Sequence, residues 1–513
     1  MGMSLAVLAE QSLERTAHLP VLGAEGTVLQ GSEVLDRSAR LARGLVDTGV
    51  TPGSRVVVVM TNRPEVVLVY LAAWRAGAAV SPLVAAVTVD ELRHVLVDSG
   101  AVCLVVSQDR LSLALQASAG LPVQVVVAGS GVALRLSDLE QCDPLPLVPR
   151  DGSDLAALLY TGGTTGRAKG VRLGHRGLVE QSGARAEVVA RSGTRGALVP
   201  LPLSHVFGLM TTVSRLHLED PGVLLLQTRF DAAEWLRLVE QHRVEAGALV
   251  PSMLQLLLRA PLEDHDLSTL RYLSIGGAPL AVPVVQEFER RVPGVVVCDG
   301  YGCTEVTSTA TMNPPWARRL GSVGLPVPRT TLKVVDDDGA ELPPGADGEV
   351  CVRSPGVMHG YWQDDAATAE VLRDGWQHTG DVGHVDDDGY LFVVDRKKDL
   401  VIRGGFNVYP RDVEDVLLAH PAVATAAVVG RPDELYGEEV VAFVGLRDGA
   451  AATAEELLAH CAEHLAATKR PRELHLLDEV PVTGVGKTDR KALRARLAAL
   501  PARPPDARPD PRA

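Results

Sequence analysis

The sequence predicts an α/β fold with a large N-terminal domain of parallel-rich, layered α/β sheets, an antiparallel β subdomain, and a small, mobile α+β C-terminal domain. Three observations predict it. The chain has 513 residues, which is too long for one hydrophobic core. Runs of β-branched residues alternate with helical patterns in the first part of the chain. From about Ser322 the pattern changes to shorter strands and turns.

The N-terminal alternation begins with a strand at residues 55–60 and a helix that starts with Pro64. Thr88 and Glu91 form a capping-box pattern at the start of a helix that reaches residue 98. Further short buried strands are expected at residues 101–106, 123–127, 156–160, 246–250, 272–275 and 295–297. Strands interleaved with helices imply βαβ units, and therefore largely parallel sheets with helices on both faces.

The antiparallel subdomain is predicted by two D-D-D-G turns, at residues 336–339 and 386–389, which lie between apolar runs. A compact α+β pattern follows, with helices at 411–419 and 454–466 and from 489, and strands at 422–429, 439–446 and 474–477. We therefore predict four segments. They are a large domain (1–395), a hinge (396–399), a small domain (400–500) and a Pro/Arg-rich tail (501–513) that we expect to be disordered.

Composition excludes several classes of protein. Hydrophobic residues make up 46% and charged residues 22% of the chain, which is typical of soluble globular proteins. The net charge is −14 and no basic stripe is present, so nucleic acid is not an expected partner. Arg75 and Pro82 interrupt the most apolar stretch, residues 66–87, so we interpret it as a buried helix followed by a strand and expect no membrane span. Six scattered cysteines without a C-x-x-C pair, and the absence of a signal peptide, predict a cytoplasmic protein.

A Gly/Thr-rich segment, YTGGTTGRAKG at residues 160–170, follows a predicted buried strand. Its glycines let the backbone approach an anion, and its hydroxyls and N–H groups can donate to phosphate oxygens. Only seven of the fifty basic residues are lysines, so the lysine that adds a point charge here is notable. The segment is not a Walker A loop, and composition alone leaves a flexible surface loop as the alternative. The candidate phosphate-binding residues are Thr161, Gly162, Gly163, Thr164, Thr165 and Lys169.

Further motifs follow in order: PLSHVFG at 202–208, GGAP at 276–279, DGYGCTE at 299–305, HTGD at 378–381, DRKKDLVIRGGFNVYPRDVE at 395–414 and PVTGVGKTDR at 481–490. Together they resemble the adenylate-forming superfamily of acyl-CoA synthetases, 4-coumarate-CoA ligases and luciferase-like enzymes. The resemblance spans residues 30–495. It implies an enzyme that uses ATP and Mg²⁺ to convert a carboxylic acid into its acyl-adenylate and then transfers the acyl group to a thiol, most simply coenzyme A.

The resemblance also implies roles for single residues. Those flanking the adenine or lying near it would be Gly277, Ala278, Asp299, Gly300 and Tyr301. Thr304 would contact the α-phosphate, and Glu305 would be the Mg²⁺ carboxylate, as a hard cation with few protein ligands requires. Asp381 would bind the ribose hydroxyls, helped by Arg396.

Three more residues match motif positions to which the superfamily assigns a role. Lys487 would reach the charge that builds up as the carboxylate attacks the α-phosphorus, and would stabilise it electrostatically. Lys398 matches the hinge about which the small domain turns between its adenylating and thioester-forming poses. His205 matches the histidine beside the acyl carboxylate, although a structural histidine is the plain alternative.

The acyl pocket is expected to bind a neutral monocarboxylic acid. Residues 206–210, after His205, contain no acid to pair with an amino group, and the presumed lining segments (207–211, 248–253, 273–278 and 303–308) are apolar or small. Two other functions compete with a coenzyme A ligase: an adenylating enzyme that delivers its acyl or aryl group to a carrier protein or another acceptor, and an inactive nucleotide-binding homologue. The presence of Lys487, Glu305 and Asp381 argues against the latter.

Overall fold

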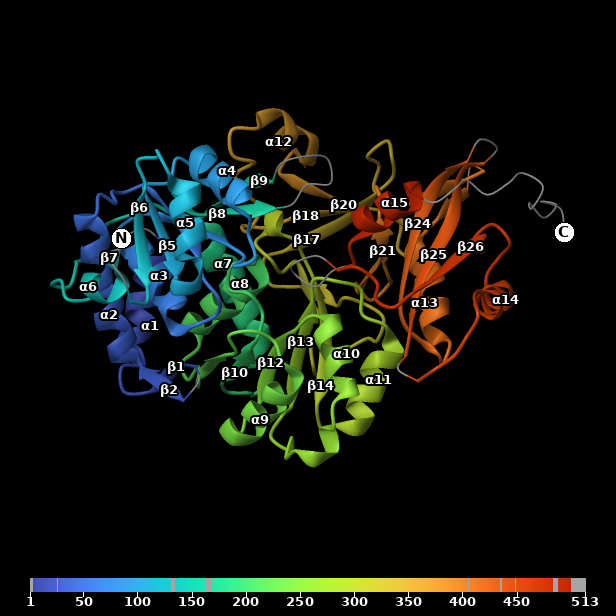
Figure 1. The fold of residues 1–513 in the computed structure, drawn as a ribbon, viewed down its shortest axis with the longest axis horizontal. Coiled ribbons are helices and arrows are strands. Elements are labelled where there is room, and N and C mark those ends of the chain that lie inside the picture. Colours follow the sequence, from blue (N-terminus) through green and yellow to red (C-terminus); the bar gives the residue numbers. More distant parts are fainter. Residues whose placement is uncertain are drawn as a thin grey trace. The chain divides into compact units, whose positions relative to one another are not determined.

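The computed structural model describes residues 3–24, 26–130, 134–161, 168–404, 406–433, 436–447, 449–482 and 488–499 (Figure 1). The chain forms two compact units. Unit 1 comprises Met1–Thr379 and Gly383–Val393, and unit 2 comprises Gly380–Val382 and Val394–Ala513.

A seven-stranded sheet begins unit 1, with strand order β7-β6-β5-β3-β4-β8-β9. Among the described residues, its strand pairings are parallel except that of β8 with β9. The strands are β3 (Arg55–Val59), β4 (Ala79–Leu83), β5 (Cys103–Ser107), β6 (Gln124–Ala128), β7 (Leu134–Arg135), β8 (Leu155–Thr161) and β9 (Lys169–Gly174). The connecting helices are α3 (Pro64–Arg75), α4 (Val89–Ser99), α5 (Leu111–Ser118) and α6 (Leu136–Leu139).

Local sequence explains where these helices begin. Thr88 Oγ1 accepts a hydrogen bond from Glu91 N at 3.3 Å, and a Glu91 carboxylate oxygen accepts one from Thr88 N at 2.8 Å, which completes the predicted capping box of α4. Pro64 occupies the first turn of α3, where its missing N–H would have no helical partner. The apolar stretch that contains α3 and β4 is buried, as the sequence predicted.

A nine-stranded sheet forms the second layer of unit 1, with order β16-β15-β14-β13-β12-β10-β11-β1-β2. It is parallel from β14 to β1 and antiparallel at both edges. The strands are β1 (Pro20–Ala24), β2 (Thr27–Gln30), β10 (Ala197–Val199), β11 (Leu224–Leu226), β12 (Ala246–Leu249), β13 (Tyr272–Gly276), β14 (Val296–Tyr301), β15 (Thr311–Met312) and β16 (Leu325–Pro326). Helices α9 (Ala232–His242), α10 (Pro251–Arg259) and α11 (Val282–Arg291) lie beside this sheet (Figure 1). They pack on it through Trp235, Leu254 and Phe288.

The remaining helices of unit 1 are α1 (Leu5–Arg15), α2 (Gly31–Asp47), α7 (His175–Ala190), α8 (Val206–Ser214) and α12 (Asp365–Val371), with short 3-10 turns η1 (Gln108–Arg110), η2 (Arg215–His217), η3 (Leu262–Asp264) and η4 (Thr304–Val306). Helices α1, α3, α7 and α8 contribute to the largest buried cluster, which also contains side chains from both sheets. Among the described residues, no helix combines the length and the apolar character needed to cross a membrane.

A third sheet has the order β17-β18-β20-β19, with β21 on β20. Its strands are β17 (Thr331–Val335), β18 (Gly348–Arg353), β19 (Leu372–Arg373), β20 (Trp376–Val385) and β21 (Leu391–Arg396). β17 and β18 are antiparallel, as are β19 and β20. Both D-D-D-G segments are turns: Asp336 N donates to Ala340 O at 2.9 Å, and Asp386 N donates to Tyr390 O at 3.0 Å.

Unit 2 contains a five-stranded sheet of order β23-β22-β25-β24, with β26 on β25. The elements are β22 (Val401–Arg403), β23 (Phe406–Val408), β24 (Val423–Asp433), β25 (Gly437–Leu446), β26 (Glu473–Leu477), α13 (Pro410–Ala419), α14 (Ala454–His464) and α15 (Arg490–Ala498). Helices α13 and α14 pack against one layer of buried strand side chains in this sheet, and α15 packs against a different layer. The predicted fold class, parallel-rich layers with an antiparallel sheet and a small α+β part, is confirmed.

Candidate active site

The ends of β13 and β14 bring five predicted nucleotide-site residues to one edge of the nine-stranded sheet. The two strands are parallel, with Ile275 opposite Asp299 and Gly276 opposite Gly300. Gly277 and Ala278 follow β13 directly, and Asp299, Gly300 and Tyr301 end β14. Carboxyl ends of parallel strands are where open α/β sheets bind ligands, because loops leave both strands at the same edge. Gly277 has φ +88°, which suits a sharp turn of the backbone there.

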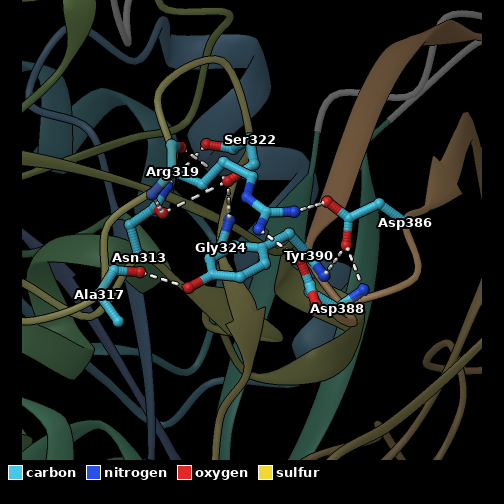
Figure 2. Close-up of polar contacts among 8 residues, drawn as sticks. All are labelled: Asn313, Ala317, Arg319, Ser322, Gly324, Asp386, Asp388 and Tyr390. Atoms are coloured by element: carbon cyan, nitrogen blue, oxygen red, sulfur yellow. Dashed lines mark hydrogen bonds and ion pairs between the residues drawn. The ribbon is translucent and has the colours of Figure 1, made fainter.

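A network behind this edge fixes the segment after β15 (Figure 2). Arg319 forms ion pairs with Asp386 and Asp388, and its guanidinium carbon lies 4.2 Å from the centre of the Tyr390 ring. Arg319 N donates to Asn313 Oδ1 at 3.0 Å. Asn313 N in turn donates to the backbone oxygen of Asp299 at 2.9 Å. The hairpin turn at residues 386–389 therefore supports the end of β14 through two intermediate residues.

Thr304 and Glu305 lie on η4, just after β14. The turn that carries them is strained, because Thr307 and Ser308 have φ values of 57° and 76°. Gly302 lies so close to it that a Cβ there would sit 1.5 Å from Ser308 O. This tight turn leaves Thr304 buried and Glu305 partly exposed.

Tyr361 links Glu305 to the predicted phosphate-loop lysine. Its hydroxyl donates to Glu305 Oε1 at 3.0 Å, and Lys169 Nζ lies 5.3 Å from its ring centre. Burial, and then the charge of Glu305, raise the pKa of Tyr361, so the phenol remains a donor. The segment is held in place by the backbone, since Met358 N donates to Glu305 O at 2.8 Å and Trp362 N donates to Gly170 O at 2.7 Å.

Lys169 begins β9 and lies in register with Thr161 of β8. Its Nζ forms an ion pair with Asp364 Oδ2 at 3.3 Å. Asp364 caps α12 by accepting a hydrogen bond from Ala367 N. This hydrogen bond lowers the pKa of Asp364, and Lys169 lowers it further. Gly162, Gly163, Thr164 and Thr165 lie outside the described residues. The structure thus brings Lys169 and Glu305 together but does not test the rest of the predicted loop.

His205 caps α8: its Nδ1 accepts a hydrogen bond from Phe207 N at 3.3 Å. Gly208 allows the helix to start close to the preceding chain, because a Cβ there would lie 2.3 Å from Pro202 O. The Phe207 ring reaches the end of β13, where a Cβ on Gly276 would lie 3.6 Å from it. His205 is therefore two residues from a side chain that lies against the end of β13.

In unit 2, Arg396 Nε lies 3.2 Å from Oδ1 of the buried Asp381, so the two predicted ribose-site residues form an ion pair. Asp395, also buried, accepts hydrogen bonds from Arg396 N at 2.7 Å and Arg411 N at 2.9 Å. Lys398 is exposed two residues further on. These contacts join Asp381 and Asp395, which precede the predicted hinge, to Arg396 within it and to Arg411 beyond it.

Lys487 lies outside the described residues, but both ends of its segment are held. Val482 and Thr488 form an antiparallel bridge, and Asp489 N donates to Pro481 O at 2.8 Å. Arg490, at the start of α15, pairs with the buried Glu414 of α13 at 2.7 Å. Burial raises the pKa of Glu414, and the Arg490 charge opposes that rise.

Two site residues were missed by the sequence analysis, Tyr361 and Asp364. Tyr361 contacts Glu305 across 56 residues of sequence, and no periodic pattern surrounds it. Asp364 does carry a local signal, since an aspartate before a helix is a common N-cap, but the cap pattern does not predict its contact with Lys169. Among the described residues, no group of three or more histidine, cysteine or acidic side chains is placed to hold a metal ion.

Comparison with known proteins identifies the family. The family model of the AMP-binding enzyme matches residues 9–362, and that of the AMP-binding enzyme C-terminal domain matches residues 412–487. A feruloyl-CoA synthase from Amycolatopsis sp is 38% identical over 92% of this chain and 94% of that protein. A 4-coumarate–CoA ligase-like protein from Oryza sativa subsp. japonica is 37% identical over 95% of this chain and 90% of its own.

A solved structure supports the same conclusion. The ATP-bound MatB from Rhodopseudomonas palustris superimposes with a TM-score of 0.91 at 30% identity, and covers 97% of this chain and 99% of that one. The two family models lie in order along the chain and together cover most of it. The chain belongs to the AMP-binding enzyme family, as the resemblance of its motifs to adenylate-forming enzymes predicted.

Proposed function

We propose that this protein is an AMP-forming acid–thiol ligase. It would join a carboxylic acid to ATP, giving acyl-AMP and pyrophosphate, and would then transfer the acyl group to coenzyme A, giving an acyl-CoA thioester and AMP. The observation that carries the proposal is the link from Lys169 through Tyr361 to Glu305, beside the ends of β13 and β14. A cation and a carboxylate linked in this way support the proposal, because an adenylate-forming enzyme needs both charges to hold the phosphates of ATP and their metal ion.

The nucleotide contacts in this proposal follow the motifs. Gly277, Ala278, Asp299, Gly300 and Tyr301 would surround the adenine, and Thr304 would contact the α-phosphate. Asp381 would bind the ribose hydroxyls, with Arg396 holding its carboxylate in place. The segment from Thr161 to Lys169 would bind the outer phosphates.

Glu305 would hold Mg²⁺ together with the phosphates of ATP. The described residues offer no multi-residue metal cluster, and a partly exposed single carboxylate fits an ion that keeps waters and phosphate oxygens as its other ligands. When bound, the ion would neutralise phosphate charge. Tyr361 would orient the carboxylate by donating to one of its oxygens, which leaves the other free.

Residues 1–395 and 400–500 would act as two domains joined by a hinge at 396–399. The two family models fall on either side of this hinge, which supports the division. Lys487 would stabilise the charge of the adenylation step, and Lys398 would be the pivot for the change to thioester formation. His205 would lie beside the acyl carboxylate. With ATP and coenzyme A as substrates, we place the enzyme in the cytoplasm.

The test is ATP–pyrophosphate exchange with a panel of carboxylic acids, followed by thioester formation with and without coenzyme A. Acid-dependent exchange and a coenzyme A thioester would support the proposal. Exchange without any thioester would favour the alternative, in which the acyl or aryl group passes to a carrier protein or another acceptor. No exchange with any acid would overturn both.

A further inference from the structure

A mostly apolar cavity lies against helix α8 in unit 1. Its volume is about 60 Å³, and its lining comes from α1, α2, α3, α8, η2, β1 and β11. A single water molecule needs ~10–15 Å³ of such space, so the cavity has room for roughly four to six groups of that size. Val21 and Leu216 in the lining are only partly buried, so the cavity is not sealed. It can therefore take up a small organic molecule.

Helix α8 separates this cavity from the predicted acyl site. The wall that the helix provides has the three- and four-residue spacing of a single helix face: Leu209, Thr212, Val213 and Leu216. Phe207, whose ring lies against the end of β13, is two residues from Leu209, and successive helical residues are about 100° apart. The two side chains therefore point to opposite sides of α8. A molecule in the cavity would be distinct from an acid bound on the Phe207 side.

Arg215 is the one charged residue of the cavity lining, and it is 8% exposed. In the described part of the chain, its Nε and Nη2 have no hydrogen-bond partner. The other hydroxyl and indole groups that line the cavity and donate to backbone oxygens are those of Thr16, Tyr70, Trp74 and Thr212. Arg215 thus supplies the buried side-chain donors of this cavity that still need an acceptor.

The two unpartnered atoms of Arg215 form one edge of its guanidinium group. This edge can bind a carboxylate through two parallel hydrogen bonds. It does so twice elsewhere in unit 1: Arg37 Nε and Nη2 donate to Glu140 at 3.0 and 3.1 Å, and Arg291 Nε and Nη2 donate to Glu263 at 2.7 and 2.6 Å. The same edge of Arg215 therefore has the donor geometry for a carboxylate that the described residues do not supply.

The charges around Arg215 leave it without a close counter-charge. Burial lowers the pKa of Arg215 to about 10, the Asp220 charge opposes the fall, and the Arg185 charge adds to it. Asp220 itself forms an ion pair with Arg195 at 3.1 Å. With a pKa of about 10, Arg215 is positively charged at neutral pH, and a buried cation of this kind gains from an anionic partner.

We propose that this cavity is a second, non-catalytic binding site for a small monocarboxylic acid. The carboxylate would pair with the Nε–Nη2 edge of Arg215, and the hydrocarbon part would fill the apolar space. A single cation among apolar walls favours a single carboxylate on a short chain, because a second charge would be buried without a partner. The site goes beyond the proposed function, since no step of the ligase reaction uses it. Arg215 is ten residues from His205, or about 15 Å at the rise of a helix.

Butyrate and butyramide, which have nearly the same size but differ in charge, test the inference in wild-type protein without ATP. Isothermal titration calorimetry measures binding, and thermal unfolding measures the stabilisation that binding to the folded state produces. Butyrate should bind at least roughly 10-fold more tightly than butyramide, because only a carboxylate can accept both hydrogen bonds with a charge. Acetate should bind roughly 10-fold more weakly than butyrate, since it lacks two methylene groups.

Substitutions of Arg215 assign the binding to the cavity. Arg215→Met should weaken butyrate binding by roughly 10- to 100-fold and remove its effect on thermal unfolding. Arg215→Lys keeps the charge but not the two-donor edge, so its affinity should be intermediate. Without acid, Arg215→Met should be at least as stable as wild type, because a buried unpaired cation is removed. Arg191→Met is the control, because Arg191 is exposed and stacks on Trp316 at 3.7 Å, and it should bind butyrate like the wild type.

Equal butyrate binding by wild type and Arg215→Met would overturn the inference. Equal binding of butyrate and butyramide by the wild type would also overturn it, and this comparison holds even if Arg215→Met does not fold. The inference would equally fail if Arg215→Met kept butyrate binding but changed the chain-length preference in pyrophosphate exchange, because the cavity would then belong to the acyl site. The binding measurements need no ATP, so a failure of exchange with every acid would remove the proposed function and leave this inference standing.

Discussion

Lys487 and Glu305 are the residues on which the proposed adenylation should depend most, and each has a nearby residue that serves as a comparison. Lys487 stands four positions before Lys491, which is exposed on α15. Glu305 accepts a hydrogen bond from Tyr361, a phenol that can be removed without removing the carboxylate. Single substitutions at these residues can therefore distinguish a role in the chemistry from a role in the structure.

Lys487→Ala should reduce acid-dependent pyrophosphate exchange by roughly 100- to 1,000-fold or more, because a cation aimed at developing charge is lost. Binding of ATP should change little, and thioester formation from supplied acyl-AMP should survive, since charge does not build up at the same place in that step. Lys491→Ala is the control and should match the wild type. Equal exchange in Lys487→Ala and wild type would refute the role.

Tyr361→Phe should raise the Mg²⁺ concentration needed for half-maximal exchange by roughly 10-fold, since the hydroxyl orients the proposed Mg²⁺ carboxylate from behind. A titration of exchange rate against Mg²⁺ measures it. The control is Tyr436→Phe, which changes a tyrosine of unit 2 that is far from Glu305 in the sequence. An unchanged Mg²⁺ dependence would show that Tyr361 has only a structural role.

At the scale of elements, two connections in unit 2 matter: the hinge at Lys398 and the attachment of α15. Arg490 of α15 pairs with Glu414 of α13, and Asp399, next to the hinge lysine, pairs with Arg494 of α15 at 2.8 Å. The helix that follows Lys487 is thereby attached to the chain that follows Lys398.

Lys398→Pro should separate the two half-reactions. Proline fixes its own φ and restricts the preceding residue, so rotation at this position is blocked. Adenylation should continue at an appreciable rate while transfer to coenzyme A falls sharply, which single-turnover assays of each step measure. A parallel loss of both steps would place the hinge elsewhere or indicate a misfolded domain.

Arg490→Met should destabilise unit 2 by ~3–5 kcal/mol, because it leaves the buried Glu414 without its cation. Adding Glu414→Gln should recover part of the loss. Arg494→Met, from the same helix but more exposed, should have an effect below about 1 kcal/mol. Chemical unfolding with hydrogen exchange of α13 and α15 distinguishes these outcomes, and equal effects of the two arginine variants would contradict the prediction.

At the scale of the whole molecule, acid stability should be limited by His175, the first residue of α7. The residue is fully buried, its Nδ1 accepts a hydrogen bond from Leu5 N at 3.3 Å, and its Nε2 has no partner among the described residues. Burial, followed by the Arg150 charge, lowers the pKa of His175 from 6.5 to about 4. The folded chain therefore holds this imidazole neutral where an unfolded chain would protonate it.

The free energy of unfolding should accordingly fall as pH decreases from 6.5 towards 4, by about 3 kcal/mol from this group, because only the unfolded chain takes up the proton in that range. Above pH 6.5 the contribution is complete. Urea unfolding at a series of pH values measures it, and His175→Gln should flatten the slope between pH 6.5 and 4. An identical slope in both proteins would assign the acid sensitivity to other groups.

The layout of the fold follows from local patterns, and the predicted elements fall within a few residues of those observed. The alternation of β-branched and helical runs predicts β3, α3, β4 and α4, because the secondary structure of these segments is determined by residues that are close in sequence. The contacts from Tyr361 to Glu305 and from Arg185 to Phe207 could not be predicted in this way. They join segments far apart in sequence, and nothing in the local pattern of α7 distinguishes a buried arginine from an exposed one.

The strained turn after β14 has a consequence for engineering the enzyme to accept other acids. A side chain at Gly302 would collide with Ser308 O at 1.5 Å, and Thr307 and Ser308 already adopt backbone angles that bulky residues resist. Mutant libraries directed at residues 302–308 would consist largely of inactive variants. Apart from Gly208, α8 is a regular helix whose backbone accepts other side chains, so diversity placed there should yield altered substrate ranges from far fewer clones.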